Sequence, residues 1–183
     1  MAKNILMITG SPRKEGNTNS LASAFMAGAI ASGNEVKVFD GANCNLDGCH
    51  GDGSCFERGY CGLQDDGVEL HKLMCWAEVL VLVSPVYWKG FTSQIKRVID
   101  RFHPYCAPKG RAACTVKETY LISAAMMPGE DAFSAMKDEF AHINAVLQFK
   151  NCGELLVPGL DGPEEAAGKE ELLMKAVMMG YNV

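Results

Sequence analysis

The chain has 183 residues, of which 48% are apolar and 21% charged, and its formal net charge is −5. A chain of this length can bury roughly 70% of its unfolded surface around one core, so we expect a single domain over residues 1–183. The apolar content is too high for a disordered chain. The negative charge gives no sequence-wide attraction to nucleic acid or to anionic lipid.

The apolar stretch near the N-terminus turns polar at Thr9. It is therefore shorter than the apolar core of a signal peptide and far shorter than a membrane span. We expect a cytoplasmic protein that binds neither membranes nor nucleic acid. In a reducing cytosol the eight cysteines stay thiols, metal ligands or redox groups rather than disulfides.

The first third of the chain reads as a strand, a helix and a second strand. Residues 4–8 form a short apolar stretch that ends at glycine, serine and proline, which is typical of a buried strand. Apolar residues then recur at helical spacing over 21–31, and a second strand is predicted over 36–39. Residues 41–67 hold seven glycines and four cysteines with little apolar periodicity. So long a connection inside one domain indicates a functional loop.

The strongest strand signal follows a short predicted helix over 68–76. Residues 79–83 are five consecutive apolar residues, which indicates a strand buried on both faces. The remaining predicted elements are, in chain order, a helix over 95–102, a strand over 119–123, a helix over 133–147, a strand over 155–157 and a helix over 164–180.

Strands that alternate with helices predict a parallel sheet covered on both faces. Five such units suit an α/β flavodoxin-like three-layer sandwich with strand order 2-1-3-4-5. In this fold the ligand crevice lies at the carboxyl ends of the first and third strands, where the winding direction reverses. In this chain those ends are Gly10 and Ser84.

The loop after the first strand is rich in side-chain donors. Residues 10–20 lead directly into a helix, whose N-terminus attracts anions. The glycine spacing of a dinucleotide fingerprint and of a P-loop is absent from this loop. Its hydroxyl, amide and guanidinium groups suit a terminal phosphate monoester, and they would also suit sulfate or a sugar phosphate. The alternative is that the polar residues only cap the helix.

The loop after the third strand offers aromatic surfaces to the same crevice. Pro85 fixes the backbone where the strand leaves the sheet, and Tyr87 and Trp88 follow it. A flat aromatic ligand can rest against such a pair. The alternative is that the two rings close the edge of the core. A phosphate loop at the neighbouring strand end favours the ligand.

Together the two loops resemble those of the NADPH-dependent FMN reductase and iron–sulfur flavoprotein family, a branch of the flavodoxin-like fold. The matching segments are residues 10–18, 84–88 and 99–101. The resemblance implies bound FMN, with its phosphate on the first loop and its ring along the second, and NAD(P)H as co-substrate. The FMN-binding residues that it implies are Ser11, Arg13, Asn17, Thr18 and Asn19 for the phosphate and Pro85, Val86, Tyr87, Trp88, Gly90, Ser123 and Ala124 around the ring.

The cysteines of the long loop leave two readings open. Cys44, Cys49, Cys55 and Cys61 are separated by gaps of four, five and five residues. Ligands of a compact cluster or of zinc usually include a pair separated by two residues, and these cysteines contain none. Iron–sulfur members of the family have closely spaced cysteines here, which residues 55–61 resemble. A [4Fe–4S] cluster would use these four thiols; the other reading is a glycine-rich lid whose thiols bind no metal.

Hydride transfer through a flavin needs no protein nucleophile or base, so no catalytic residue is assigned. The resemblance implies an enzyme that passes electrons from NAD(P)H through FMN to a quinone, a nitro or azo compound, a free flavin or an iron centre. It also implies a homo-oligomer, either a homodimer or a homotetramer. The alternative functions are a flavin-binding electron carrier for a protein partner and a redox sensor based on the cysteine loop.

Overall fold

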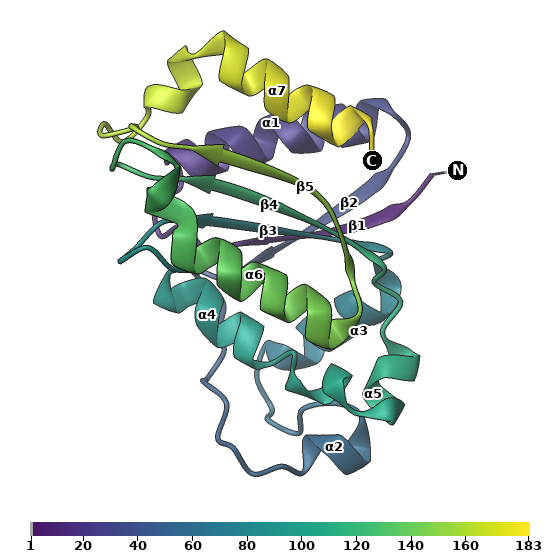
Figure 1. Ribbon diagram of the computed structural model, residues 1–183. Helices are drawn as coiled ribbons and strands as arrows, with labels where there is room; N and C mark the ends of the chain where they lie inside the picture. The colour runs from purple at the N-terminus through teal and green to yellow at the C-terminus, as the bar shows by residue number, and fades with distance from the viewer. Residues whose placement is uncertain (1) are drawn as a thin grey trace.

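The computed structural model describes residues 2–183 and contains one five-stranded parallel sheet. Its strand order, β2-β1-β3-β4-β5, is the predicted one. The strands are β1 (Asn4–Thr9), β2 (Glu35–Asp40), β3 (Val79–Pro85), β4 (Glu118–Ala124) and β5 (Lys150–Val157). Because all five run in the same direction, their carboxyl ends meet at one edge of the sheet (Figure 1).

Helices cover both faces of the sheet (Figure 1). One face carries α1 (Asn17–Ala31) and α7 (Glu170–Tyr181). The other carries α3 (Gly67–Trp76), α4 (Ser93–Asp100) and α6 (Ser134–Leu147). Two short helices, α2 (Cys55–Arg58) and α5 (Pro108–Ala113), lie beyond this second layer, away from the sheet (Figure 1). Single turns of 3-10 helix span His103–Cys106, Glu130–Phe133 and Glu165–Gly168.

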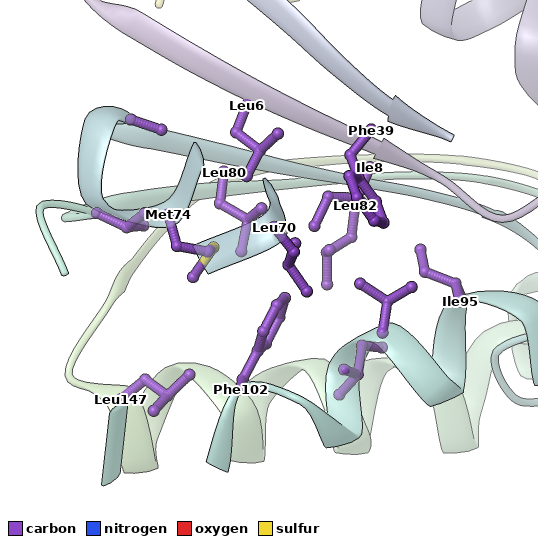
Figure 2. Packing of buried hydrophobic residues seen from close by; sticks show 14 of the residues in the cluster. Leu6, Ile8, Phe39, Leu70, Met74, Leu80, Leu82, Ile95, Phe102 and Leu147 are labelled. Atoms are coloured by element: carbon purple, nitrogen blue, oxygen red, sulfur yellow. The ribbon is translucent and has the colours of Figure 1, made fainter. Parts of the chain in front are cut away.

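Successive side chains of the central strands β1 and β3 point to opposite faces of the sheet, so the core has two layers. Leu6 and Ile8 of β1 pack on the side of α3, α4 and α6, as Figure 2 shows, together with Leu80 and Leu82 of β3. The intervening side chains, such as Met7, pack on the side of α1 and α7. Both sets are buried, which confirms the prediction of strands covered on both faces.

Helices α1 and α7 approach each other closely through two glycines. A Cβ atom on Gly28 would lie 2.0 Å from the carbonyl oxygen of Val177, and one on Gly180 would lie 2.0 Å from the carbonyl oxygen of Phe25. No larger residue fits at either position without separating the helices. The two glycines therefore set the distance between α1 and α7.

Several element boundaries differ from the predictions. β5 begins at Lys150 rather than at residue 155, because its first half is an exposed edge without an apolar run. The loop over 41–67 contains α2, a single helical turn too short for periodicity to reveal. The last predicted helix divides into the turn Glu165–Gly168 and α7. Within the described residues, no helix is long and apolar enough to cross a membrane.

Candidate functional site

A hollow of about 370 Å³ opens at the carboxyl edge of the sheet, where the winding direction reverses. We refer to it as the edge hollow. It is bounded by the turns that follow β1, β3, β4 and β5. Its lining residues are Ser11, Arg13, Gly16, Asn17, Thr18, Pro85, Val86, Tyr87, Trp88, Ala124, Ala125, Met126, Leu160, Asp161, Gly162 and Pro163.

Buried hydroxyl groups join the strand ends beneath the edge hollow. The Thr92 hydroxyl donates to the carbonyl oxygen of Gly10 at 2.8 Å, and the Thr92 N–H donates to the Ser84 hydroxyl at 3.2 Å. The Ser123 hydroxyl donates to the carbonyl oxygen of Ser84 at 2.7 Å. A Cβ atom on Gly10 would lie 2.5 Å from the Ile95 Cβ, so only glycine permits this approach. These contacts fix the ends of β1, β3 and β4 relative to one another.

One end of the edge hollow is built to receive an anion. α1 begins here after the extended Gly16, and the first N–H groups of a helix have no intrahelical acceptor. The buried side chains of Ser11 and Thr18 add hydroxyl groups, and Arg13 adds a positive charge on the exposed part of the loop. Such a set can bind the several oxygens of a phosphate monoester.

Two asparagines predicted to bind phosphate have protein partners for their amide groups. Asn17 donates to the carbonyl oxygen of Gly162 at 2.7 Å and accepts from the Ala166 N–H at 2.9 Å, so it ties the turn after β5 to the start of α1. Asn19 donates to the carbonyl oxygen of Arg13 at 2.9 Å and lies outside the lining. Both side chains hold the loops in position, and Asn17 can still offer its backbone N–H to the anion.

The aromatic wall of the edge hollow is a tight turn. Tyr87 and Gly90 exchange backbone hydrogen bonds of 3.1 and 3.0 Å, and the two residues between them have positive φ, 52° at Trp88 and 64° at Lys89. Such a turn favours glycine and asparagine, so this one is strained. The Met136 N–H donates to the Lys89 carbonyl oxygen at 2.9 Å and holds the turn in place. The Trp88 side chain is fully exposed at the mouth of the hollow.

The lining also includes a segment that the sequence did not point to. Residues 160–163 line the hollow, and the Leu160 N–H donates to the Ala125 carbonyl oxygen at 3.0 Å. The available signal was indirect: in a parallel sheet the turn after the last strand reaches the same edge as the others.

The structure brings most of the predicted FMN-binding residues to one hollow. Ser11, Arg13, Asn17, Thr18, Pro85, Val86, Tyr87, Trp88 and Ala124 line it. Asn19, Gly90 and Ser123 do not, because each is engaged behind the lining: Asn19 with the first loop, Gly90 with Tyr87, and Ser123 with Ser84.

The long cysteine loop is anchored on α4 by two arginines. Arg97 donates to the carbonyl oxygens of Leu46, Gly41 and Cys44 at 3.0 to 3.1 Å. Arg101 forms a bidentate pair with Asp65, with both N–O distances 2.8 Å, and its side chain is 1% exposed. The Arg101 guanidinium lowers the pKa of Asp65 to about 2. Both ends of the loop are therefore fixed, while its middle projects from the molecule.

The sheet order and the edge hollow define a flavodoxin-like protein. The chain belongs to the NADPH-dependent FMN reductase family, whose sequence model matches residues 3–152. Its groups fit FMN, because an anion-binding helix start faces an aromatic wall across one continuous hollow.

Curated relatives and solved structures agree with this assignment. The chain is 38% identical over 98 residues to an iron–sulfur flavoprotein of Archaeoglobus fulgidus and 37% identical over 100 residues to one of Methanocaldococcus jannaschii. These matches cover 54% and 55% of this chain. The chain spans about half the length of these relatives, 44% of the first and 52% of the second.

The fold is also that of known reductases. An NAD(P)H:quinone oxidoreductase from Methanothermobacter marburgensis has a TM-score of 0.81 at 18% identity, with 100% of this chain and 96% of that chain covered. An azoreductase from Bacillus anthracis has a TM-score of 0.73 at 16% identity, with both chains fully covered. At these identities the likeness concerns the fold.

Proposed function

We propose that the protein is an FMN-dependent oxidoreductase that passes electrons from NAD(P)H through bound FMN to a small-molecule acceptor. The observation that carries this proposal is the edge hollow, in which a helix start with Ser11, Thr18 and Arg13 faces an aromatic wall. Family membership supports the same cofactor. We further propose that residues 1–183 act as one flavodoxin-like domain, and that the protein assembles as a homodimer or homotetramer.

Each part of the edge hollow has a separate task in this proposal. Ser11, Thr18 and Arg13 bind the phosphate together with the first N–H groups of α1, and Asn17 holds the turn after β5 against them. The backbone of residues 85–88 and Ala124 border the ring. Bound FMN supplies the hydride-accepting chemistry, so the chain needs to supply only position and electrostatics.

The acceptor class follows from the exposed side of the hollow. Trp88 is fully exposed and Met126 largely exposed at its mouth, where a flat, apolar molecule can contact both. Quinones and nitro or azo aromatics have this shape. The structural neighbours include a quinone oxidoreductase and an azoreductase, which supports the same class.

Steady-state kinetics test the proposal. Full-length protein loaded with FMN should oxidise NADH or NADPH rapidly when a quinone is present. Slow NAD(P)H oxidation by a protein that nevertheless binds FMN tightly would indicate the electron carrier instead. A folded protein that fails to bind FMN in a flavin fluorescence titration would overturn both functions.

A further inference from the structure

A second hollow, of about 310 Å³, lies under the projecting middle of the cysteine loop. We refer to it as the thiol hollow. Three cysteines line it, Cys49, Cys55 and Cys61, together with the histidine and aspartate side chains of His50, Asp52, Asp100 and His103. Cys44 is elsewhere: its thiol lies 3.6 Å from Arg97 and packs against the main core. The set of four thiols considered from the sequence is therefore not the set that the fold gathers.

The chain around the thiol hollow is held firmly at its borders. Arg97 and Arg101 fix the segments before and after it to α4. The ring of Phe56, next to Cys55 in α2, lies 4.7 Å from the ring of His103, and His103 Nδ1 lies 3.6 Å from the Cys55 sulfur. The fold itself thus brings the three thiols to one place, without any bond among them.

The arrangement of the thiol hollow does not suit a single metal ion. Within residues 2–183, no three histidine, cysteine or acidic side chains converge on one point at metal-binding distances. Zinc requires such convergence, because all its ligands bind one atom. In a [4Fe–4S] cluster each ligand binds a different iron, so the ligands surround a larger object. Thiols placed around a hollow fit a cluster, and the relatives named iron–sulfur flavoproteins are consistent with one.

The sequence supplies a fourth ligand at the expected spacing once carboxylates are counted. Asp52 follows Cys49 by three positions and precedes Cys55 by three, which leaves two residues in each gap. Consecutive two-residue gaps are the spacing of cluster-binding cysteines in bacterial ferredoxins. Gly51 and Gly53 flank Asp52 with φ of 69° and 71°, so the backbone turns tightly on both sides of it. Asp52 thus occupies the sequence position of a middle thiolate. Its Oδ1 accepts from the Ser54 N–H at 3.0 Å and from the Ser54 hydroxyl at 2.8 Å, so Oδ2 is the oxygen that would bind iron.

We propose that Cys49, Asp52, Cys55 and Cys61 bind a [4Fe–4S] cluster in which Asp52 is the oxygen ligand of one iron. Cys44 takes no part, and His103 acts as a positioning residue beside the Cys55 sulfur. Carboxylate oxygen is a harder ligand than thiolate and holds that iron less firmly. With a cluster bound in this way, a one-electron oxidant would convert [4Fe–4S]2+ to [3Fe–4S]+, with release of Fe2+ and transfer of one electron to the oxidant.

Cluster assembly on the full chain tests this ligand set. The protein is incubated anaerobically with Fe2+ and sulfide, and its iron and sulfide contents are measured. Electron paramagnetic resonance spectra are then recorded before and after oxidation with ferricyanide. The wild type should gain the [3Fe–4S]+ signal on oxidation, Asp52→Cys should keep all its iron, and Cys55→Ala should assemble no cluster. Cys44→Ala is the matched control and should behave as the wild type.

Three results would overturn the proposal. The first is loss of the cluster in Cys44→Ala. The second is identical behaviour of the wild type and Asp52→Cys on oxidation. The third is a wild-type protein that takes up zinc but no iron and sulfide. An FMN fluorescence titration on each variant shows that the fold is intact, and it separates failure of the cluster from failure of the proposed reductase.

Discussion

Arg13 is the guanidinium at the anion-binding end of the edge hollow, and its loss should weaken FMN binding. A charge-assisted hydrogen bond contributes about 1.5–3 kcal/mol, so Arg13→Ala should raise the Kd for FMN about tenfold or more. Flavin fluorescence titration measures this change. Lys14→Ala is the matched control, because Lys14 is the neighbouring cation but lies outside the lining. Equal effects of the two substitutions would mean that Arg13 acts only through general charge.

The pair of Asp65 and Arg101 should make stability depend on acidity. The pKa of Asp65 falls from its usual 3.8 to about 2, so the unfolded chain takes up this proton first as the pH drops. The contribution of the pair is present above about pH 4 and is lost between about pH 4 and pH 2. Urea unfolding should show that the free energy of unfolding of the wild type falls across this pH range. In Asp65→Asn the fall should be smaller.

At pH 7, Asp65→Asn leaves the buried guanidinium of Arg101 without its charged partner. Asp65→Asn should lower the free energy of unfolding by about 3–5 kcal/mol. Glu171→Gln is the control, because Glu171 forms an exposed pair with Lys175 and its substitution should leave the free energy of unfolding almost unchanged. Equal losses in the two variants would contradict the structural role given to the buried pair.

Trp88 combines backbone strain with full exposure, which indicates a contact role rather than a packing role. Trp88→Gly should keep or raise the free energy of unfolding, because it relieves positive φ and removes no buried surface. The KM for a flat aromatic acceptor should rise. Lys89→Gly relieves the same kind of strain and keeps the indole, so it should leave KM unchanged. A KM that stays constant in Trp88→Gly would remove the indole from the acceptor site.

At the level of the elements, the close contact of α1 and α7 gives a sharp test. Gly28→Ala places a methyl group 2.0 Å from the Val177 carbonyl oxygen, so the helices must separate. Forced overpacking of this kind costs about 1–3 kcal/mol. Chemical denaturation measures the loss. Gly168→Ala is the control, since its methyl group meets no atom within 4 Å; a comparable loss there would refute the explanation.

The elements also show which parts of the fold could be predicted. β3 was evident because five consecutive apolar residues are buried on both faces. The first half of β5 was missed because residues 150–154, which are exposed or half-buried, carry no apolar pattern, and only pairing with β4 makes them a strand. The loops after β1 and β3 identified the edge hollow, whereas residues 160–163 reach it only through the topology.

Candidate ligands were harder to predict than strands. The grouping of four cysteines in one loop suggested four ligands, although their spacing lacks a two-residue gap. In the structure the Cys44 thiol packs against the core beside Arg97, away from the thiol hollow that the other three line. Asp52, which we propose as the fourth ligand, was not considered because only thiols were counted. For the asparagines, the residue type correctly indicated a polar loop, but a sequence cannot tell whether an amide faces a ligand or a neighbouring carbonyl.

For the molecule as a whole, α4 links the two hollows. Thr92, which joins the strand ends, directly precedes α4. Arg97 in α4 and Arg101, which directly follows α4, hold the cysteine loop. The cysteine loop projects beyond the helical layer, while the edge hollow lies at the ends of the strands (Figure 1). The two sites are thus attached to one rigid element and use separate side chains.

This arrangement predicts that the cysteine loop can be loosened without loss of flavin binding. Arg97→Ala removes three hydrogen bonds to carbonyl oxygens of the loop. Proteolysis within residues 48–61 should become faster, while the Kd for FMN stays the same. Lys96→Ala is the control on the same helix, because Lys96 pairs with the exposed Asp100 and the half-buried Glu139, neither of which belongs to the cysteine loop. A parallel fall in FMN affinity would show that the two sites depend on each other.

The hydroxyl contacts of Ser84, Thr92 and Ser123 have a broader consequence. They use main-chain atoms and small side chains, and they involve none of the large residues that a visiting molecule would touch. Residues at the rim of the edge hollow can therefore be substituted without breaking the hydrogen bonds that hold the strand ends together. A fold of this kind can change its specificity for electron acceptors through substitutions at a few rim positions, while the residues proposed to bind FMN stay the same.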